Sequence, residues 1–493
     1  MSTHSIRQIS RQLLIASACL ASACLLTSGT LAQSPKIDVR VLSDSNRAAI
    51  EINSAPASSW SFLDSYAGIV GLGRRVERFT AFDATGAEVS VSQTAPGQFR
   101  SVKPARRISY EVNVQPVLRS SDFSRLSWLD KEGGVLMPLD LLPLSMDSAA
   151  VAEVRSIRFQ LPPSWAVSSN ETMLAPNEFA VADAGRAVFA LGTNLRVSDL
   201  KLSGLTLNFV TKGAWAFSDP DVLQLAQQVL NAHRETFGAF PSRSATLILF
   251  PFPIAVPASQ WSAETRGATV TLLMGKSPSK VAALAQLSTP LAHEFFHLWV
   301  PNALKLEGTY DWFYEGFTIY QASRTAVKLG LLTFPEFLNS IARAYDAARS
   351  DTSLSLIEAS NRRFTSGVNS VYAKSQVIAF LYDLRLRSAT RNRRGLGDVY
   401  RKLMKSRDAS AQSSDGSEAV ATILTDEIGS PEFVDSFIRH PVSVNLASEL
   451  APFGLTVDAS AFRTQISVNP KPSKEQRDLL RELGYNAATH APR

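Results

Sequence analysis

The chain is nearly without cysteine. Its two cysteines, Cys19 and Cys24, both lie in the first 32 of 493 residues. Once that segment is removed, the chain can form neither a disulfide nor a thiolate metal site. Any metal ion must then be bound by histidine and carboxylate side chains, and histidine itself is scarce, with six in the whole sequence.

A strong charge of either sign is absent as well. The formal net charge is +6, and without Arg7 and Arg11 there are 48 basic residues against 44 acidic ones. No basic cluster is interleaved with aromatic residues, so the sequence predicts no nucleic-acid partner. The length and the 45% hydrophobic content suffice for two or three domains with large cores.

Residues 1–32 have the pattern of a secretory signal. A positively charged start precedes the apolar run Leu13–Leu26, and Thr30–Ala32 fits a small-residue cleavage site. A membrane anchor is the competing interpretation, but serine and threonine interrupt the run. We expect an exported protein, periplasmic or secreted, without a stable membrane span after signal removal; lipid attachment at Cys24 is a minor alternative.

The pattern along the chain predicts an α+β multidomain protein. Residues 33–212 are β-rich, with Ile108–Val114 alternating apolar and polar residues, and predict an amino-terminal antiparallel β-sandwich. Residues 213–455 contain two apolar strands and then mainly helices, and predict a second domain. Residues 456–493 are weakly patterned and are expected to form a carboxy-terminal tail.

The most informative motif is the H-E-x-x-H pattern of His293–His297. Two histidines four residues apart share one face of a helix, so both imidazoles can reach a single metal ion. A catalytic zinc site takes three protein ligands and leaves one position for water. Thr289-Pro290 either begins this helix or lies in a kinked continuation of an earlier one.

Glu315 is the candidate for the third ligand. It lies in an aromatic-rich segment beginning at Asp311, a short connection after the histidines, which permits antiparallel packing of two helices. A solvated glutamate is the alternative when the residue is taken alone. With His293 and His297 upstream, the pattern favours a His-His-Glu site for one Zn²⁺ per chain.

Glu294, between the two histidines, is the candidate general base. It would take a proton from a water on the zinc ion and pass it to the leaving amine. A tetrahedral intermediate also needs a donor for its oxyanion, and a tyrosine hydroxyl is a common choice.

These segments resemble the zinc segments of the glycyl aminopeptidase family, which are gluzincin metallopeptidases. The likeness rests on His293–Trp299 and Trp312–Tyr320, continues through Val371–Ser375, and covers roughly residues 200 to 455. It implies a thermolysin-like, mainly helical zinc peptidase domain after a β-rich domain. The family often ends in a PDZ domain, whereas only 38 residues follow Leu455 here.

The resemblance also implies roles for particular residues. His293, His297 and Glu315 would bind zinc, and Glu294 would be the base. Two further residues match family positions: Tyr372 would stabilise the transition state, and Glu264 would bind the free α-amine of the substrate. Taken alone, Tyr372 reads as an ordinary half-buried tyrosine, with Tyr310, Tyr314 and Tyr320 as competitors, and Glu264 as a surface carboxylate.

One departure concerns the amine site. The family usually has two glycines just before this glutamate, where the chain has Ser262-Ala263.

The predicted function is an exported zinc aminopeptidase acting on short peptides. The alternatives are a zinc endopeptidase of the same fold, favoured if Glu264 does not reach the site, and a catalytically silent peptide-binding protein. The sequence does not indicate an oligomeric state.

Overall fold

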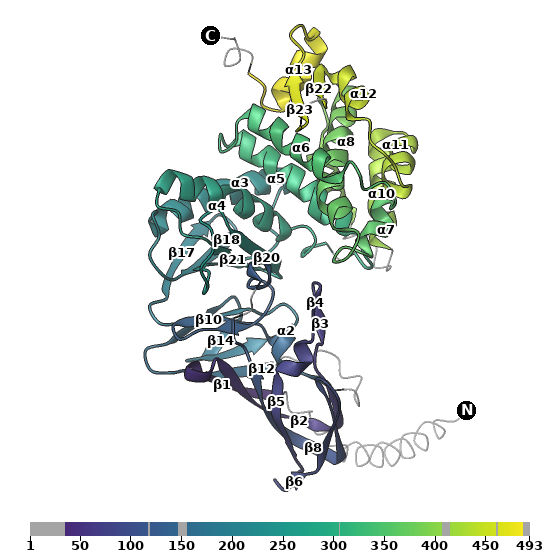
Figure 1. The fold of residues 1–493 in the computed structure, drawn as a ribbon. Helices are drawn as coiled ribbons and strands as arrows, with labels where there is room; N and C mark the ends of the chain where they lie inside the picture. The colour runs from purple at the N-terminus through teal and green to yellow at the C-terminus, as the bar shows by residue number, and fades with distance from the viewer. Residues whose placement is uncertain are drawn as a thin grey trace, which may run out of the picture.

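The computed structural model describes residues 35–116, 119–145, 155–304, 306–406, 415–459 and 462–486. The chain runs from a β-rich part, through a smaller sheet backed by helices, to a helical part at the opposite end (Figure 1). The predicted signal segment, with Cys19 and Cys24, lies outside the described residues. Among the helices that are described, none has the length and apolar content needed to cross a bilayer.

The first layer is a ten-stranded sheet. Ile108, Tyr110 and Val112 of β8 are buried and alternate with partly exposed residues, as the sequence pattern predicts. Its strands, in pairing order, are β14 (Thr172–Ala175), β15 (Glu178–Val181), β12 (Arg155–Gln160), β1 (Lys36–Leu42), β2 (Arg47–Ser61), β8 (Gln98–Asn113), β5 (Val76–Phe82) and β6 (Glu88–Val89), with β7 (Val91–Ala95) beside β8 and β11 (Leu144–Ser145) beside β2.

A four-stranded sheet forms the second layer. It comprises β13 (Ala166–Ser169), β16 (Phe189–Gly192), β10 (Gly133–Leu136) and β9 (Trp128–Leu129). Leu136 and Phe189 share a core with the ten-stranded sheet, while Trp128 and Val135 pack from the other face against Ile248 of the next sheet. The predicted β-sandwich is confirmed, with β1 and β12 as a parallel pair in an otherwise antiparallel sheet.

The third layer is a mixed five-stranded sheet. Its order is β17 (Arg196–Leu202), β18 (Leu205–Thr211), β19 (Ser244–Pro251), β21 (Thr269–Met274) and β20 (Trp261–Arg266). The strands β18, β19 and β21 run parallel, and β20 is an antiparallel edge strand. Thus β17 and β18 pair with the strands of the second domain although they precede residue 213, where the sequence places its start; the domain bounds stay predictions.

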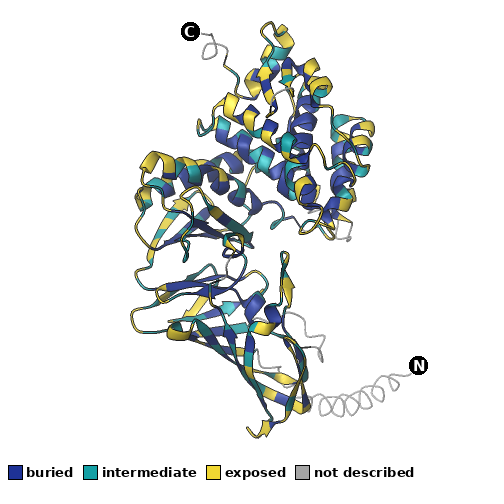
Figure 2. Cartoon of the chain, in the orientation of Figure 1, coloured by how far each residue is buried: buried dark blue, intermediate teal, exposed yellow. Residues whose placement is uncertain are grey.

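Helices cover this sheet and make up most of the chain that follows it, and buried residues run through their centre (Figure 2). They are α3 (Asp219–Phe237), α4 (Lys280–His297), α5 (Thr318–Lys328), α6 (Phe334–Ala348), α7 (Leu356–Ser360), α8 (Ser375–Thr390), α9 (Leu396–Ser406), α10 (Gly416–Ile428), α11 (Glu432–Val434), α12 (Leu446–Leu450) and α13 (Lys474–Glu482), with π-helical η4 (Trp312–Phe317), η5 (Ser370–Lys374) and η6 (Asp435–Arg439).

Helix α4 carries the H-E-x-x-H motif and is buried on nearly all sides. The Ser279 side chain accepts a hydrogen bond from the Ala282 N–H and caps its start. Pro290 lies inside this one helix, so Thr289-Pro290 marks a continuation and not a start. Because its neighbours are a sheet and other helices, apolar residues occur around the whole circumference in its second half.

Two π-helical segments pack against each other beside α4. Segment η4 carries Glu315, and η5 carries Tyr372. Gly316 permits this contact, because a Cβ there would collide with the Ser375 side chain and lie 2.8 Å from the Val371 carbonyl oxygen. π-Helical turns inside helices recur at functional sites, and here they bring two predicted site residues together.

The segment after Leu455 is folded where it is described. A hairpin of β22 (Leu455–Asp458) and β23 (Gln465–Val468) precedes α13. Leu479, Leu480 and Leu483 are buried in the main helical core. The residues expected to form a tail therefore cover the end of the helical part.

His233 on α3 is a buried imidazole beside the metal-binding helix. Its Nε2 lies 2.8 Å from the Ala292 carbonyl oxygen, and burial lowers its pKa to about 4, from an ordinary 6.5. The unfolded chain therefore takes up this proton as the pH falls through 6.5, and the folded chain does so only near 4. We expect His233 to cost about 3 kcal/mol of folding stability across that window.

The test is thermal unfolding of His233→Gln beside wild type from pH 7.5 to 4. The difference in melting temperature should shift in favour of the variant as the pH falls from 6.5 towards 4, and level off below. Exposed His440→Gln is the matched control and should follow wild type. Parallel curves for wild type and His233→Gln would contradict the assignment.

Candidate metal centre

Three side chains meet at one point where α4 faces η4. His293 Nε2 lies 3.0 Å from His297 Nε2, and Glu315 Oε2 lies 3.4 and 3.7 Å from these two nitrogens. Ligands at the zinc distances of about 2.0–2.1 Å in a tetrahedral site are about 3.3 Å apart. The three residues therefore fit one zinc ion, and within the described ranges no other group of histidine and carboxylate side chains has such spacing.

The backbone after α4 orients one of the two histidines. His297 Nδ1 lies 2.8 Å from the Val300 carbonyl oxygen, so its proton is placed on that nitrogen and Nε2 is left to bind a metal. His293 Nδ1 is buried without a hydrogen-bond partner among the described residues. Burial lowers the pKa of His297, but the Glu315 carboxylate outweighs it and the net shift is upward.

Glu315 uses its two oxygens differently. Oε2 faces the histidines, and Oε1 accepts a hydrogen bond of 2.6 Å from Arg363 Nη2. Burial would raise the pKa of this carboxyl, but Arg363 and then His297 pull it well below its usual range. Glu315 is thus held as a carboxylate, with one oxygen turned to the metal position.

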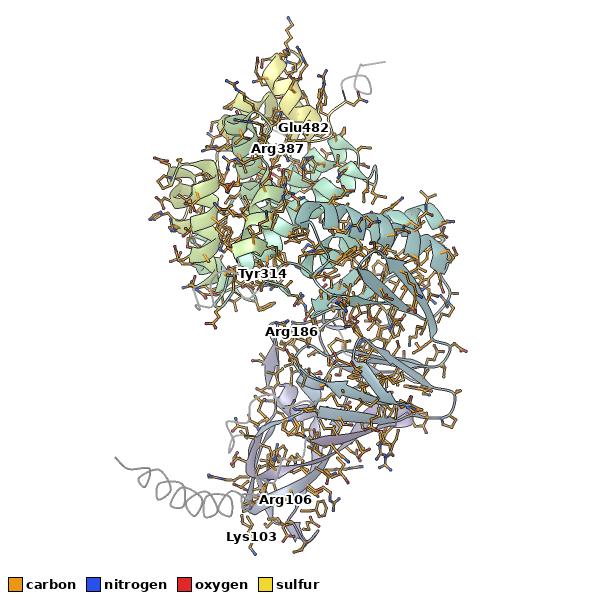
Figure 3. The ribbon with its side chains drawn as sticks, turned by 180° about the vertical axis from the view of Figure 1, so that it is seen from behind. Lys103, Arg106, Arg186, Tyr314, Arg387 and Glu482 are labelled. Carbon is orange, nitrogen blue, oxygen red and sulfur yellow. The ribbon has the colours of Figure 1, made fainter. Side chains whose placement is uncertain are left out.

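Arg363 connects this ligand to its surroundings. Its Nη1 donates to Asp311 Oδ1 at 3.0 Å and to the Tyr314 hydroxyl at 2.9 Å, and its Nε donates to the Tyr372 hydroxyl at 3.0 Å. Tyr314 in turn donates to Asp311. Tyr314 lies at the edge of the helical part that faces the β-rich part (Figure 3).

Tyr372 shares the Arg363 guanidinium with Glu315 and keeps its proton. Burial, followed by the charge of Glu315, raises the pKa of its phenol although Arg363 opposes this. Because Arg363 donates to the phenol oxygen, the phenol proton remains available for another acceptor. Of the competing tyrosines, Tyr314 already donates to Asp311 and Tyr320 to Asp383.

Glu294 is buried next to the same point. The Thr265 hydroxyl lies 2.7 Å from Glu294 Oε2 and 2.9 Å from its carbonyl oxygen, and can give its proton to either. Thr265 therefore ties the edge strand β20 to the second residue of the motif and restricts the direction in which the Glu294 carboxylate points.

Glu264, on the same strand, faces the amino-terminal domain. Oε1 accepts hydrogen bonds from the Tyr66 hydroxyl at 2.7 Å and from Arg266 Nε at 3.0 Å. Oε2 accepts none from the described residues, and Arg125 Nε lies 3.4 Å from it. Tyr66 belongs to the hairpin of β3 (Ser65–Tyr66) and β4 (Ile69–Val70), and Arg125 follows the short helix η3 (Ser120–Asp122).

Ser262, two residues before Glu264, also takes part in the contact between β20 and the amino-terminal domain. The Ser262 side chain is buried, 2.8 Å from the Ser124 hydroxyl and 3.0 Å from the Ser121 carbonyl oxygen. Serine therefore replaces the usual family glycine while joining β20 to the loop that carries Arg125.

The sequence did not single out several residues around the site, namely Arg363, Thr265, Tyr66, Arg125 and Arg266. Thr265 and Arg266 directly follow Glu264, and strand alternation could have placed Thr265 on the α4 side. No motif or residue spacing in the sequence points to Arg363.

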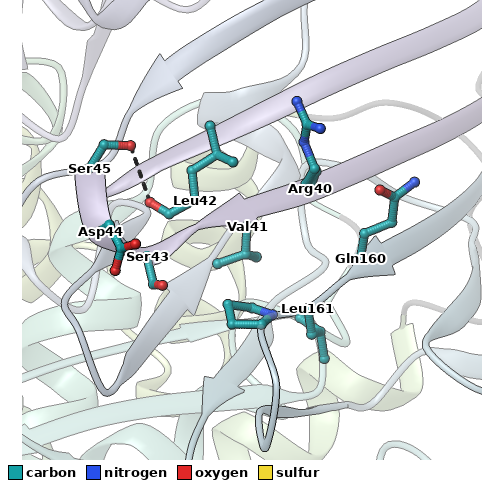
Figure 4. A pocket seen from close by; sticks show the side chains of 9 residues that line it. Arg40, Val41, Leu42, Ser43, Asp44, Ser45, Gln160 and Leu161 are labelled. Carbon is teal, nitrogen blue, oxygen red and sulfur yellow. Dashed lines mark hydrogen bonds between the residues drawn. The ribbon is translucent and has the colours of Figure 1, made fainter.

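A separate cavity of about 510 Å³ lies on the β-rich domain (Figure 4). It is lined by the end of β1 and the short helix η1 (Ser43–Ser45), together with Gln160, Leu161 and Pro162. Its only ionisable side chains are Arg40 and Asp44, and it contains none of the metal-binding groups. It offers no competing catalytic arrangement.

The fold is similar to that of solved zinc metallopeptidases of the aminopeptidase N type. An aminopeptidase N family protein from Idiomarina loihiensis matches with a TM-score of 0.73, covering 90% of this chain and 82% of its own, at 16% identity. An M1 zinc metallopeptidase from Deinococcus radiodurans, a variant bound to the substrate Tyr-Ser-Ala, matches with a TM-score of 0.55, covering 84% and 95%, at 14% identity.

By sequence, no family profile and no curated protein matches the chain. At identities of 14–16% the likeness to the solved structures is one of fold. It confirms the predicted arrangement of a β-rich domain followed by a mainly helical domain.

Arg363 provides a test of the ligand geometry. In Arg363→Gln the buried Glu315 Oε1 loses its cation, so the carboxylate is freer to turn and to take up a proton. We expect zinc affinity, measured by competition with a chromogenic chelator, to fall about 10- to 100-fold. Exposed Arg362→Gln is the neighbouring control and should bind zinc like wild type; unchanged affinity in Arg363→Gln would contradict the assignment.

Proposed function

We propose that the protein is a zinc-dependent aminopeptidase that hydrolyses peptide bonds near the amino terminus of short peptides. The observation that carries the proposal is the His-His-Glu set, which has the buried Glu294 between its two histidines and Arg363 joining Glu315 to the Tyr372 hydroxyl. The shared fold with M1 zinc metallopeptidases, one of which was solved with a tripeptide substrate, supports it. One zinc ion per chain, bound by His293, His297 and Glu315, is part of the proposal.

A zinc ion in this site would supply Lewis acidity toward the scissile carbonyl and make the attacking water more acidic. Glu294 takes the proton from that water and returns it to the leaving amine. Thr265 keeps the Glu294 carboxylate aimed at this position through a 2.7 Å contact. Tyr372 donates its proton as a hydrogen bond to the developing oxyanion, and Arg363 holds the phenol in place.

Specificity for the amino terminus rests on Glu264. Tyr66 and Arg266 hold Oε1, whereas Oε2 has only the 3.4 Å ion pair with Arg125 among the described residues and is left for a ligand. An α-ammonium group can bind this oxygen as a charged hydrogen-bond donor. The ordered carboxylate therefore favours an aminopeptidase over the two alternatives, an endopeptidase of the same fold and a catalytically silent peptide-binding protein.

The cellular site belongs to the proposal as well. The signal-like segment 1–32 supports export to the periplasm or the medium, with lipid attachment at Cys24 as the minor alternative. The substrate class is peptide, and neither nucleic acid nor a stable membrane span is part of the proposed function.

Glu294→Gln tests the chemistry. The amide is nearly the same size but cannot accept the water's proton, so kcat on an Ala-anilide should fall about 10²- to 10⁴-fold with zinc content unchanged. Metal analysis and a steady-state assay on the same sample separate the two effects. Exposed Glu475→Gln is the control and should keep full activity; equal turnover by Glu294→Gln and wild type would exclude the proposed mechanism.

Glu264→Gln tests the specificity. Removing the charge should lower kcat/KM for free-amine substrates about 10- to 100-fold, because a charged hydrogen bond is lost. Cleavage of an amino-blocked internal peptide of the same sequence should change little. If wild type prefers the blocked peptide, the endopeptidase alternative replaces the aminopeptidase.

A further inference from the structure

The surroundings of Glu264 carry more positive charge than an ammonium site needs. Arg266 is buried, donates to Glu264 and to the Arg125 carbonyl oxygen, and packs over the Tyr66 ring. Arg125 pairs with the same carboxylate from the other side. One carboxylate thus faces two guanidinium groups.

The two arginines differ in side-chain exposure and in the number of their hydrogen-bond and ion-pair contacts. Arg266 makes its contacts through Nε and Nη2 and has a side-chain exposure of 6%. The Arg125 side chain is 24% exposed, and its contacts among the described residues are the 3.4 Å ion pair through Nε and a loose approach to the Phe364 ring at 5.9 Å. The fork of Arg125 is therefore open to a planar anionic partner.

Arg125 also lies on the side of the site where the chemistry occurs. Phe364, over which it sits, directly follows Arg363, and Arg363 contacts both Glu315 and Tyr372. A peptide whose ammonium binds Glu264 Oε2 has its first residue beside Arg125, because Arg125 Nε lies 3.4 Å from that oxygen. The first side chain leaves the same Cα as that ammonium, so it is within reach of this guanidinium.

Resting on the function proposed above, we propose that the enzyme selects peptides whose first residue is acidic, with Arg125 binding the side-chain carboxylate. An ammonium arriving at Glu264 repels Arg125 and weakens its ion pair. A glutamate or aspartate side chain gives Arg125 a new carboxylate, so every charge remains paired. A neutral first residue leaves Arg125 beside another cation without a partner, which disfavours its binding.

The test compares substrates that differ by charge alone. On zinc-loaded wild type, kcat/KM for a Glu-anilide should exceed that for a Gln-anilide about 10- to 100-fold. Arg125→Gln should reduce this ratio to near one, whereas Arg119→Gln, an exposed arginine on the same loop, should preserve it. A wild-type ratio of one or below, with Gln- and Ala-anilides cleaved, overturns the inference and leaves the proposed function standing.

A binding measurement separates the two failures further. Zinc-loaded Glu294→Gln should bind free L-glutamate more tightly than L-glutamine by calorimetry, and Arg125→Gln added to it should remove the difference. Equal affinities for the two amino acids overturn the inference, even if wild type cleaves no anilide. Tighter binding of glutamate, with no anilide cleaved by wild type, supports the inference and counts against the proposed enzyme mechanism. The ratio should also shrink with added salt, because the contact is partly exposed.

Discussion

The site depends on how one buried carboxylate is compensated. An unpaired carboxylate inside a protein costs several kcal/mol, and neutral histidines do not offset that cost. The guanidinium of Arg363 does so for Glu315, at 2.6 Å. The same group binds Asp311, Tyr314 and Tyr372, so one cation determines how η4, η5 and the loop between α7 and η5 sit around the metal position. Gly316 makes the close packing sterically possible.

The parts of the site that depend on helical spacing could be predicted from the sequence. His293, Glu294 and His297 follow from one helical turn, and Glu315 from the short connection after it. The contact between Arg363 and Glu315 could not be predicted, because no motif or residue spacing in the sequence links the two. The contact arises only when η4 and η5 pack together, and that packing depends on the tertiary fold.

The fold too was predictable from the sequence only in part. Alternation predicted strands such as β8 correctly, because burial on one face leaves a period of two. It did not indicate which sheet a strand joins: β17 and β18 read as sandwich strands, yet β18 pairs in parallel with β19, which lies beyond α3. Likewise, three leucines in a short segment are too weak a signal to predict that α13 packs onto the helical core, as Leu479, Leu480 and Leu483 do.

The hairpin and loop that surround Glu264 belong to the β-rich domain, whereas the metal ligands and Glu294 belong to the helical one. Tyr66 and Arg125 reach the site only because the two domains are docked, with Ser262 and Ser124 joining them. In the proposed function, a chain whose two domains had not docked would keep its metal-binding side chains but would lack Tyr66 and Arg125 beside Glu264. Part of the surroundings of Glu264 is thus encoded in the amino-terminal stretch of the sequence, and a change in the β3–β4 hairpin can alter these surroundings without altering the proposed catalytic groups.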